Sequence, residues 1–161
     1  MVLLKTLVFT VVVPGTWIVF IPYWLLSSGS ARSDLDMGPF RYFGVIPMIL
    51  GAAIYFRCAW DFTFTGKGTP APFDPPKELV ARGLYRFVRN PMYIGVLFVL
   101  LGEALLFESR RLFELAGLAF VIFYLVIVIY EEPILRRKFG DSYQQYCDSV
   151  SRWVPRKPRR Q

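Results

Sequence analysis

The sequence has no histidine and only two cysteines among its 161 residues. Without histidine, the Ser/His and Cys/His arrangements of nucleophilic enzymes are excluded, as are the common histidine metal sites. Cys58 and Cys147 lie far apart with no Cys-x-x-Cys spacing, so neither a disulfide framework nor a zinc site is indicated. We expect no metal, and any chemistry must use carboxylates, tyrosines, arginines or a cofactor.

Acidic residues are also few, with 12 against 19 lysines and arginines, which gives a net charge of +7. Most of the cations lie between or after apolar runs, as they do in loops that face anionic lipid. We therefore expect membrane lipids as partners and no nucleic acid. Since 55% of the residues are hydrophobic and 17% are aromatic, the composition indicates an integral membrane protein.

The apolar runs predict an all-α fold, a single membrane domain over residues 1–161 with about four transmembrane helices. The predicted spans lie at about 3–26, 42–60, 91–107 and 112–130. The first run could instead be a signal peptide, but its length favours a retained helix. Five cations between residues 61 and 90, and eight after residue 130, predict cytoplasmic termini. We expect a multi-pass protein of a bacterial inner membrane.

The predicted cytoplasmic loop, 61–90, contains a stretch rich in proline and glycine from Thr63 to Lys77, which indicates a structured loop or lid. Residues 78–88 alternate apolar and basic side chains, a pattern typical of a short interfacial helix before the third span. An amphipathic region follows the fourth span at 133–153, where we expect further interfacial helices, broken at Gly140. The basic tail, 154–161, would anchor the chain to anionic lipid.

Two turns of the chain should meet on one side of the membrane. Asn90 is a favoured helix N-cap and Pro91 fits the first helical turn, so the third span starts there. The polar link Glu108–Arg111 joins the third and fourth spans into a hairpin, which returns the chain to the face it left. We therefore expect Asn90-Pro91 to lie near Glu132-Pro133.

Several side chains at this junction are candidates for binding. Arg89 and Tyr93 are one helical turn apart, beside free N–H groups that suit a small charged ligand. Glu131 and Glu132 end an apolar span, where carboxylates are costly unless they face water, a cation or a polar pocket. Glu132 could pair with Arg136, four residues on, whereas Glu131 is open to a ligand or a structural role.

Three further residues within the third span are candidates for packing or function. Gly95 and Gly102 are seven residues apart on one helix face, a spacing more typical of close helix packing than of ligand contact. Glu103 is a carboxylate within the predicted span, which makes it a functional candidate.

Four motifs together resemble a known family. They are Asn90-Pro91-Met92-Tyr93-x-Gly95, Tyr130-Glu131-Glu132-Pro133, Phe139-Gly140-x-x-Tyr143-x-x-Tyr146 and Arg152-Trp153-x-Pro155. The chain resembles, from about Gly83 to Pro155, the integral membrane methyltransferases that include the isoprenylcysteine carboxyl methyltransferases and the phospholipid N-methyltransferases.

The resemblance implies S-adenosylmethionine as cofactor at the cytoplasmic face, and a lipophilic acceptor that carries an amine or a carboxylate. It implies Arg89 and Glu131 as catalytic residues. The cofactor-binding residues it implies are Arg89, Asn90, Pro91, Tyr93, Gly95, Glu131, Glu132 and Tyr143. The carboxyl methyltransferase branch commonly has histidine where this chain has Asn90, whereas the phospholipid branch tolerates asparagine, which leaves the acceptor open.

Two other functions stay open at this point. The C-terminal pattern is similar to that of sterol reductases, which implies an NADPH-dependent membrane reductase. A non-catalytic lipid-binding protein could also have kept the shape of the site.

Overall fold

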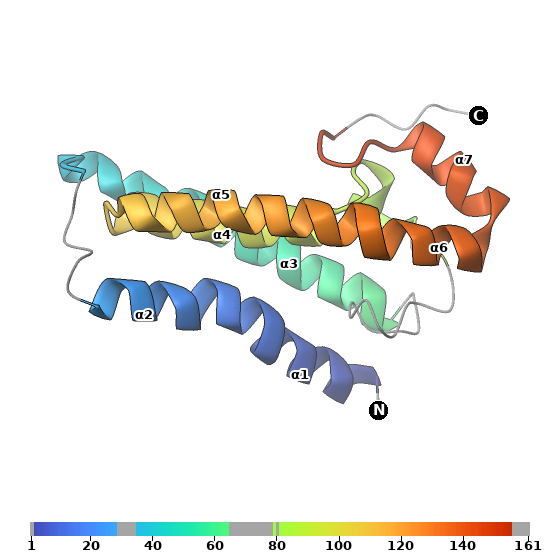
Figure 1. Cartoon of the computed structure of the whole chain (residues 1–161), viewed down its shortest axis with the longest axis horizontal. Helices are drawn as coiled ribbons and strands as arrows, with labels where there is room; N and C mark the ends of the chain where they lie inside the picture. The colour runs from blue at the N-terminus through green and yellow to red at the C-terminus, as the bar shows by residue number, and fades with distance from the viewer. Residues whose placement is uncertain (1, 29–34, 65–78, 80, 156–161) are drawn as a thin grey trace.

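The computed structural model describes residues 2–28, 35–64, 79 and 81–155, and helices make up most of it (Figure 1). Within these residues there is no β-strand, only an isolated bridge between Val88 and Ser151. The predicted all-α class is confirmed. The helices run back and forth along one long axis, and the first helix begins at the end of the molecule where the last helix lies.

The first helix is continuous from α1 (Val2–Gly15) through a π-helical turn, η1 (Thr16–Phe20), to α2 (Ile21–Ser27). In a π turn each backbone hydrogen bond joins residues five apart, so the turn holds one more residue than an α turn. The extra residue rotates the side chains that follow to another face of the helix. Hydroxyl bonds attach the start of this helix to the bundle, because Tyr55 donates to Thr10 at 2.9 Å and Thr63 to Thr6 at 3.2 Å.

The centre of the bundle is the contact between α3 (Val45–Phe64), which follows the 3-10 turn η2 (Gly38–Gly44), and α4 (Pro91–Leu106). Glycines let the two backbones touch. A Cβ on Gly51 would lie 2.4 Å from the carbonyl oxygen of Gly95, and one on Gly102 would lie 2.5 Å from that of Gly44. The helix-packing interpretation of Gly95 and Gly102 is confirmed, since small residues allow close approach where lipid provides no hydrophobic drive.

The predicted hairpin is confirmed as well. After α4, a short link at Phe107–Ser109 leads into α5 (Arg110–Leu125). Glu108 in this link has φ +52°, and its carboxylate accepts a 2.9 Å bond from the backbone N–H of Met37.

The bounds predicted for the fourth span, 112–130, stay a prediction, and the helix that contains this segment extends beyond them. From α5 the helix continues through a second π turn, η4 (Val126–Glu131), into α6 (Glu132–Phe139), so that one helix runs from Arg110 to Phe139. Pro133 lies in the first turn of α6, directly after η4. A π turn is the kind of local adjustment that accommodates a missing N–H without ending a helix. The break occurs at Gly140, with φ +53°, as predicted, and α7 (Asp141–Ser149) follows.

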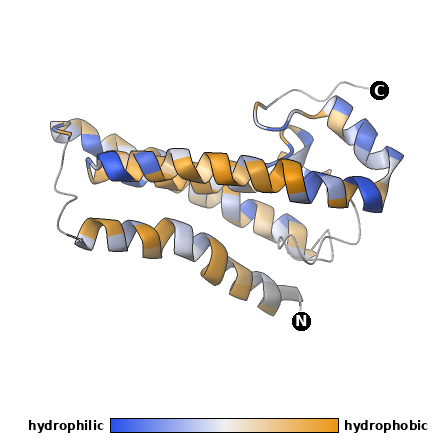
Figure 2. Cartoon of the chain, viewed as in Figure 1, coloured by the Kyte–Doolittle hydropathy of each residue, from blue (hydrophilic) through white to orange (hydrophobic). Residues whose placement is uncertain are grey.

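In the part of the chain that the structure describes, three helices are long and apolar enough to cross a membrane: Thr6–Ser27, Gly38–Phe64 and Arg110–Phe139. The fourth predicted span, α4, has 16 residues and is shorter than these. Figure 2 shows the apolar residues along the middle of the bundle and many of the hydrophilic ones at its ends.

The interfacial helix predicted at 78–88 is wrong over the described residues. These hold only a 3-10 turn, η3 (Gly83–Arg86). A regular helix is interrupted at Gly83, which has φ +57° and lies next to the side chain of Asp61, and the side chains of Tyr85 and Val88 are buried in the protein. Whether α6 and α7 lie in a membrane interface stays a prediction. The proline-rich loop beyond Phe64 and most of the basic tail lie outside the described residues.

Candidate functional site

The motif residues meet at the end of the bundle where α4 begins and η4 passes into α6. The helix α7 and the segment after it fold back over this end (Figure 1). Motifs that are about 40 residues apart in sequence therefore share one location, as the hairpin predicts.

Glu132 is the centre of the charged contacts. Its side chain is 9% exposed, and it accepts bonds of 2.8 and 3.0 Å from the guanidinium of Arg152 and lies 3.3 Å from that of Arg89. The predicted pair with Arg136 is not formed, because Arg136 donates to Gln144 instead. A buried carboxylate needs compensating charge, and two guanidinium groups supply it.

The second contact joins α4 to η4. The hydroxyl of Tyr93 donates to the carboxylate of Glu131, which is half-buried beside Glu132. Arg89 and Tyr93, which are one helical turn apart, thus contact different glutamates, Glu132 and Glu131. The ring of Tyr93 also packs on Phe123, with centroids 4.9 Å apart.

The C-terminal segment holds the start of α4 in place. The backbone N–H of Arg89 donates to the carbonyl of Ser151 at 2.9 Å, and the side-chain amide of Asn90 donates to the carbonyl of Arg152 at 3.2 Å. Asn90 is the N-cap residue, as predicted, but its side chain makes no cap bond because it is used in this contact. Pro91 follows it, fully buried.

Tyrosines of α7 cover the cluster. Tyr143 is buried, and Tyr146 donates a 2.7 Å bond to the carbonyl of Tyr85. Burial raises the pKa of both phenols, with smaller contributions from Cys147 and Glu132 at Tyr143 and from Tyr143 at Tyr146. Cys147 accepts a bond from Arg89 at 2.8 Å.

Most predicted site residues are thus brought together at this end of the bundle; they include Arg89, Asn90, Tyr93, Glu131 and Glu132. Tyr143 lies within electrostatic range of Arg89 and Glu132. Gly95 instead packs on the backbone of α3, and its cofactor-binding role stays a prediction.

The prediction missed Arg152 as a site residue. Two features of the sequence could have indicated it. Arg152 begins the terminal motif, and the adjacent carboxylates of Glu131 and Glu132 need cations near them. No spacing rule connects residues 20 apart across the break at Gly140.

The cluster can bind groups of both signs. The buried Nε–H of Arg89 has no hydrogen-bond partner within the described part of the chain, so it can donate to an anion. Glu131 offers carboxylate oxygens to hydrogen-bond donors or to a cation. A zwitterionic ligand matches this pair.

Comparisons with known proteins agree on a family. The sequence model described as "Phospholipid methyltransferase" matches residues 40–142. The protein-S-isoprenylcysteine O-methyltransferase of Schizosaccharomyces pombe is 35% identical over 48% of this chain and 33% of its own length. Protein-S-isoprenylcysteine O-methyltransferase A of Arabidopsis thaliana is 29% identical over 70% of this chain and 58% of its own length. Methanethiol S-methyltransferase 2 of Bradyrhizobium diazoefficiens is 36% identical over 45% of this chain and 27% of its own length.

The chain spans between about a third and three fifths of the length of the first curated relatives it matches. The family model takes in more than half of its 161 residues. This chain belongs to the phospholipid methyltransferase family of membrane enzymes.

Proposed function

We propose that the protein is an S-adenosylmethionine-dependent methyltransferase that acts on a lipophilic acceptor at the cytoplasmic face of its membrane. The observation that carries the proposal is a pair of neighbouring contacts at the start of α4, Arg89 with Glu132 and Tyr93 with Glu131, within the region matched by the methyltransferase family.

The residues at this site fit the cofactor. S-adenosylmethionine carries a carboxylate, an ammonium, ribose hydroxyls and a sulfonium. The unpartnered Nε–H of Arg89 suits the carboxylate, and Glu131 suits the ammonium or the hydroxyls. The ring of Tyr93, fixed between Phe123 and Glu131, can lie against the sulfonium by a cation–π contact.

Glu132 has a different role in this proposal from Glu131. Its oxygens are used by Arg152 and Arg89, so we assign it to holding the two guanidinium groups. Asn90 and Pro91 fix the start of α4, and Tyr143 shields the ion pairs from water. Shielding strengthens those pairs, because water no longer screens them.

The cofactor, when bound, supplies an electrophilic methyl group for in-line displacement. The chain's contribution is to position the acceptor, exclude water and balance charge around the sulfonium, which suffices for a nucleophilic acceptor. Of the two adjacent glutamates, Glu131 is the one whose carboxylate is not bound by guanidinium groups of the described residues, so we assign it to taking a proton from an amine or thiol acceptor. The hydroxyl of Tyr93 fixes its orientation.

The proposed topology has four spans, with α4 as the third. Its 16 residues extend about 24 Å, a little short of the hydrocarbon thickness. However, α4 packs against α3 and α5, and apart from Glu103 its side chains carry no charge. The site end then carries both termini and faces the cytoplasm of a bacterial cell, in accord with the excess of cations there.

Calorimetric titration of the purified protein with S-adenosylhomocysteine tests the cofactor. We expect binding to wild type, and about 10- to 100-fold weaker binding to Glu131→Gln, the cost of one charge-assisted hydrogen bond. Glu114→Gln is the matched control, because Glu114 is an exposed glutamate in α5 whose partner among the described residues is the exposed Arg110. Folded protein that binds neither this ligand nor S-adenosylmethionine in several lipids would refute the proposal.

A second experiment identifies the acceptor and separates the alternatives. In cells that overproduce the protein, an untargeted lipid analysis should find species heavier by one methyl group, which are absent with Glu131→Gln. Binding of NADPH without S-adenosylmethionine would favour a reductase. Cofactor binding unchanged by Glu131→Gln would favour a non-catalytic protein.

A further inference from the structure

An aromatic series connects the first helix to the candidate site. The ring of Trp17, in η1, lies 5.3 Å from the ring of Phe123, which lies 4.9 Å from that of Tyr93, whose hydroxyl bonds Glu131. The first helix lies outside the region that the family model matches, which starts at residue 40. The ring contacts therefore reach Tyr93 from a residue that the family match does not include.

Two of the three helices that contribute to this series carry a π turn beside it, and α4, which carries Tyr93, is the third. Trp17 belongs to η1, and Glu131 is the last residue of η4. The extra residue in η1 also explains why Trp24, seven positions after Trp17, is on another face: Trp17 is half-buried, whereas Trp24 is 61% exposed. π turns are rare in helices and frequently mark functional sites.

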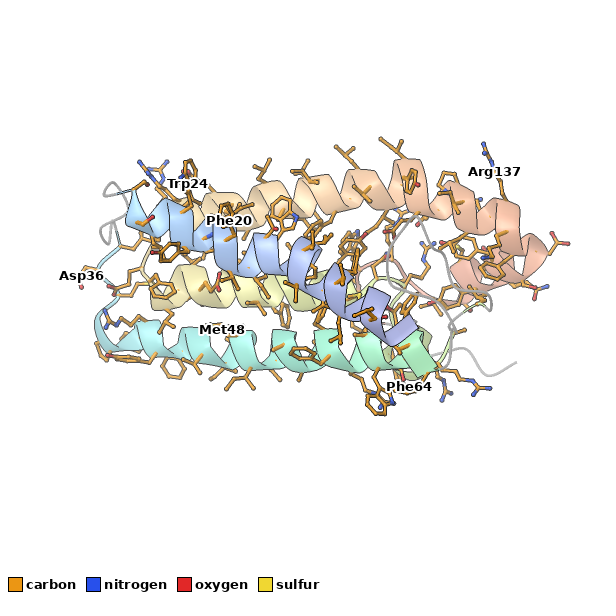
Figure 3. The ribbon with its side chains drawn as sticks, turned by 90° about the horizontal axis from the view of Figure 1, so that it is seen from below. Phe20, Trp24, Asp36, Met48, Phe64 and Arg137 are labelled. Atoms are coloured by element: carbon orange, nitrogen blue, oxygen red, sulfur yellow. The ribbon has the colours of Figure 1, made fainter. Side chains whose placement is uncertain are left out.

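The two halves of the first helix are held differently. Hydroxyl bonds from Tyr55 and Thr63 fix the first half at Thr10 and Thr6. In the second half, Thr16 and Ser27 bond back to their own helix. The contacts of this half with the core are apolar; they come from Trp17, Ile18, Ile21, Leu25 and Leu26. Figure 3, viewed from the side of the first helix, shows this helix crossing the bundle obliquely, with the half that carries Phe20 and Trp24 towards α5 and the first half towards α3.

Apolar contacts between helices are easily replaced in a membrane, because a lipid chain is as apolar as the side chains it displaces. Within the described residues, no side chain of Thr16–Ser27 donates a hydrogen bond to another helix, so an aliphatic chain can enter beneath this half while the hydroxyl bonds keep the first half in place. The series from Trp17 to Tyr93 then leads such a chain to the carboxylate of Glu131.

We propose that the second half of the first helix is one wall of the acceptor site, and that Trp17 is the specificity-determining residue against which the apolar chain of the acceptor packs. This rests on the proposed function, and it names the substrate class as a molecule with a flexible aliphatic chain and a nucleophilic head. The head lies at Tyr93 and Glu131, and the chain lies along Phe123 and Trp17.

Fluorescence quenching tests the wall without knowledge of the acceptor. In one protein Trp24, Trp60 and Trp153 are replaced by phenylalanine, which leaves Trp17 as the only tryptophan. In the matched control Trp24 is left instead, on the same helix but exposed. Both are reconstituted in lipid with S-adenosylhomocysteine and titrated with 1-bromododecane, whose bromine quenches tryptophan on contact.

We expect 1-bromododecane to remove most of the Trp17 emission along a saturable curve. The Trp24 emission should fall only in proportion to the probe dissolved in the lipid. Equal, unsaturable quenching of both tryptophans would overturn the inference. Calorimetry on the same Trp17 protein separates the two proposals: cofactor binding without saturable quenching removes this inference alone, and saturable quenching without cofactor binding removes the proposed function and leaves an apolar-chain site.

Where methyl transfer from labelled S-adenosylmethionine into a total lipid extract is measured, Trp17→Ala should shift the products towards acceptors with bulkier chains. Trp24→Ala should leave the product profile as in wild type. Identical profiles for the two variants would contradict a specificity role for Trp17.

Discussion

The ion pairs of Glu132 give a stability prediction whose size follows from their burial. Glutamine at position 132 keeps the shape of the side chain but removes its charge and turns an amide N–H₂ towards a guanidinium. The Arg89 side chain is only 13% exposed and is left uncompensated, whereas Arg152, at 28%, regains part of its hydration. Removing one partner of a buried pair costs about 3–5 kcal/mol, and we expect about 3 kcal/mol because Arg152 can rehydrate.

This loss can be measured as a thermal shift. At about 2–4 °C per kcal/mol for a chain of this size, Glu132→Gln should lower the apparent Tm by about 6–12 °C in detergent. The control is Glu114→Gln, which removes an exposed pair with Arg110 at 3.0 Å, where both side chains are more than 60% exposed. Such pairs contribute about 0.3–0.5 kcal/mol, so the control should shift the Tm by no more than about 2 °C.

A double variant tests the reasoning about Arg89. Glu132→Gln combined with Arg89→Gln removes the uncompensated charge, so it should be more stable than Glu132→Gln alone. A Glu132→Gln protein that melts with the Glu114→Gln control would refute the burial argument. A double variant less stable than either single variant would refute the assignment of the cost to an unpaired Arg89.

Three further predictions concern packing, pH and the C-terminal contact. Gly102→Ala places a Cβ against the backbone of η2 and should cost about 1–3 kcal/mol, whereas Gly117→Ala, with open space around it, should be neutral or stabilising by up to about 1 kcal/mol; thermal melts compare them. Because burial raises the pKa of Tyr146 above its unfolded value near 10, its contribution to stability is complete below about pH 10 and is lost as the pH rises further, so melts of Tyr146→Phe should show a smaller alkaline loss than wild type. Arg152→Lys loses the two-pronged contact with Glu132, and we expect the melt to show a loss of about 1–2 kcal/mol; an unchanged Tm would mean that a single ammonium contact suffices.

The sequence by itself determined the class of fold and the location of the site. Runs of apolar residues predict helices of membrane length, and the link at Glu108–Arg111 predicts the hairpin, because both depend on local composition. The spacing of Gly95 and Gly102 also predicted their packing role, since residues seven apart share a helix face. From the hairpin it followed that the Asn90 and Glu132 motifs would meet.

Only the tertiary structure decided which side chains contact one another there. The spacing of four residues favours a pair between Glu132 and Arg136, but Arg136 contacts Gln144 instead. The guanidinium of Arg152, which lies beyond the chain reversal at Gly140, donates to both carboxylate oxygens of Glu132. The helix that continues through Pro133 and the position of Trp17 both depend on π turns, and no residue pattern in the sequence predicts these turns. Contacts between segments far apart in sequence, such as Arg89 with Ser151, have no periodicity that could reveal them, because they arise from how the helices pack.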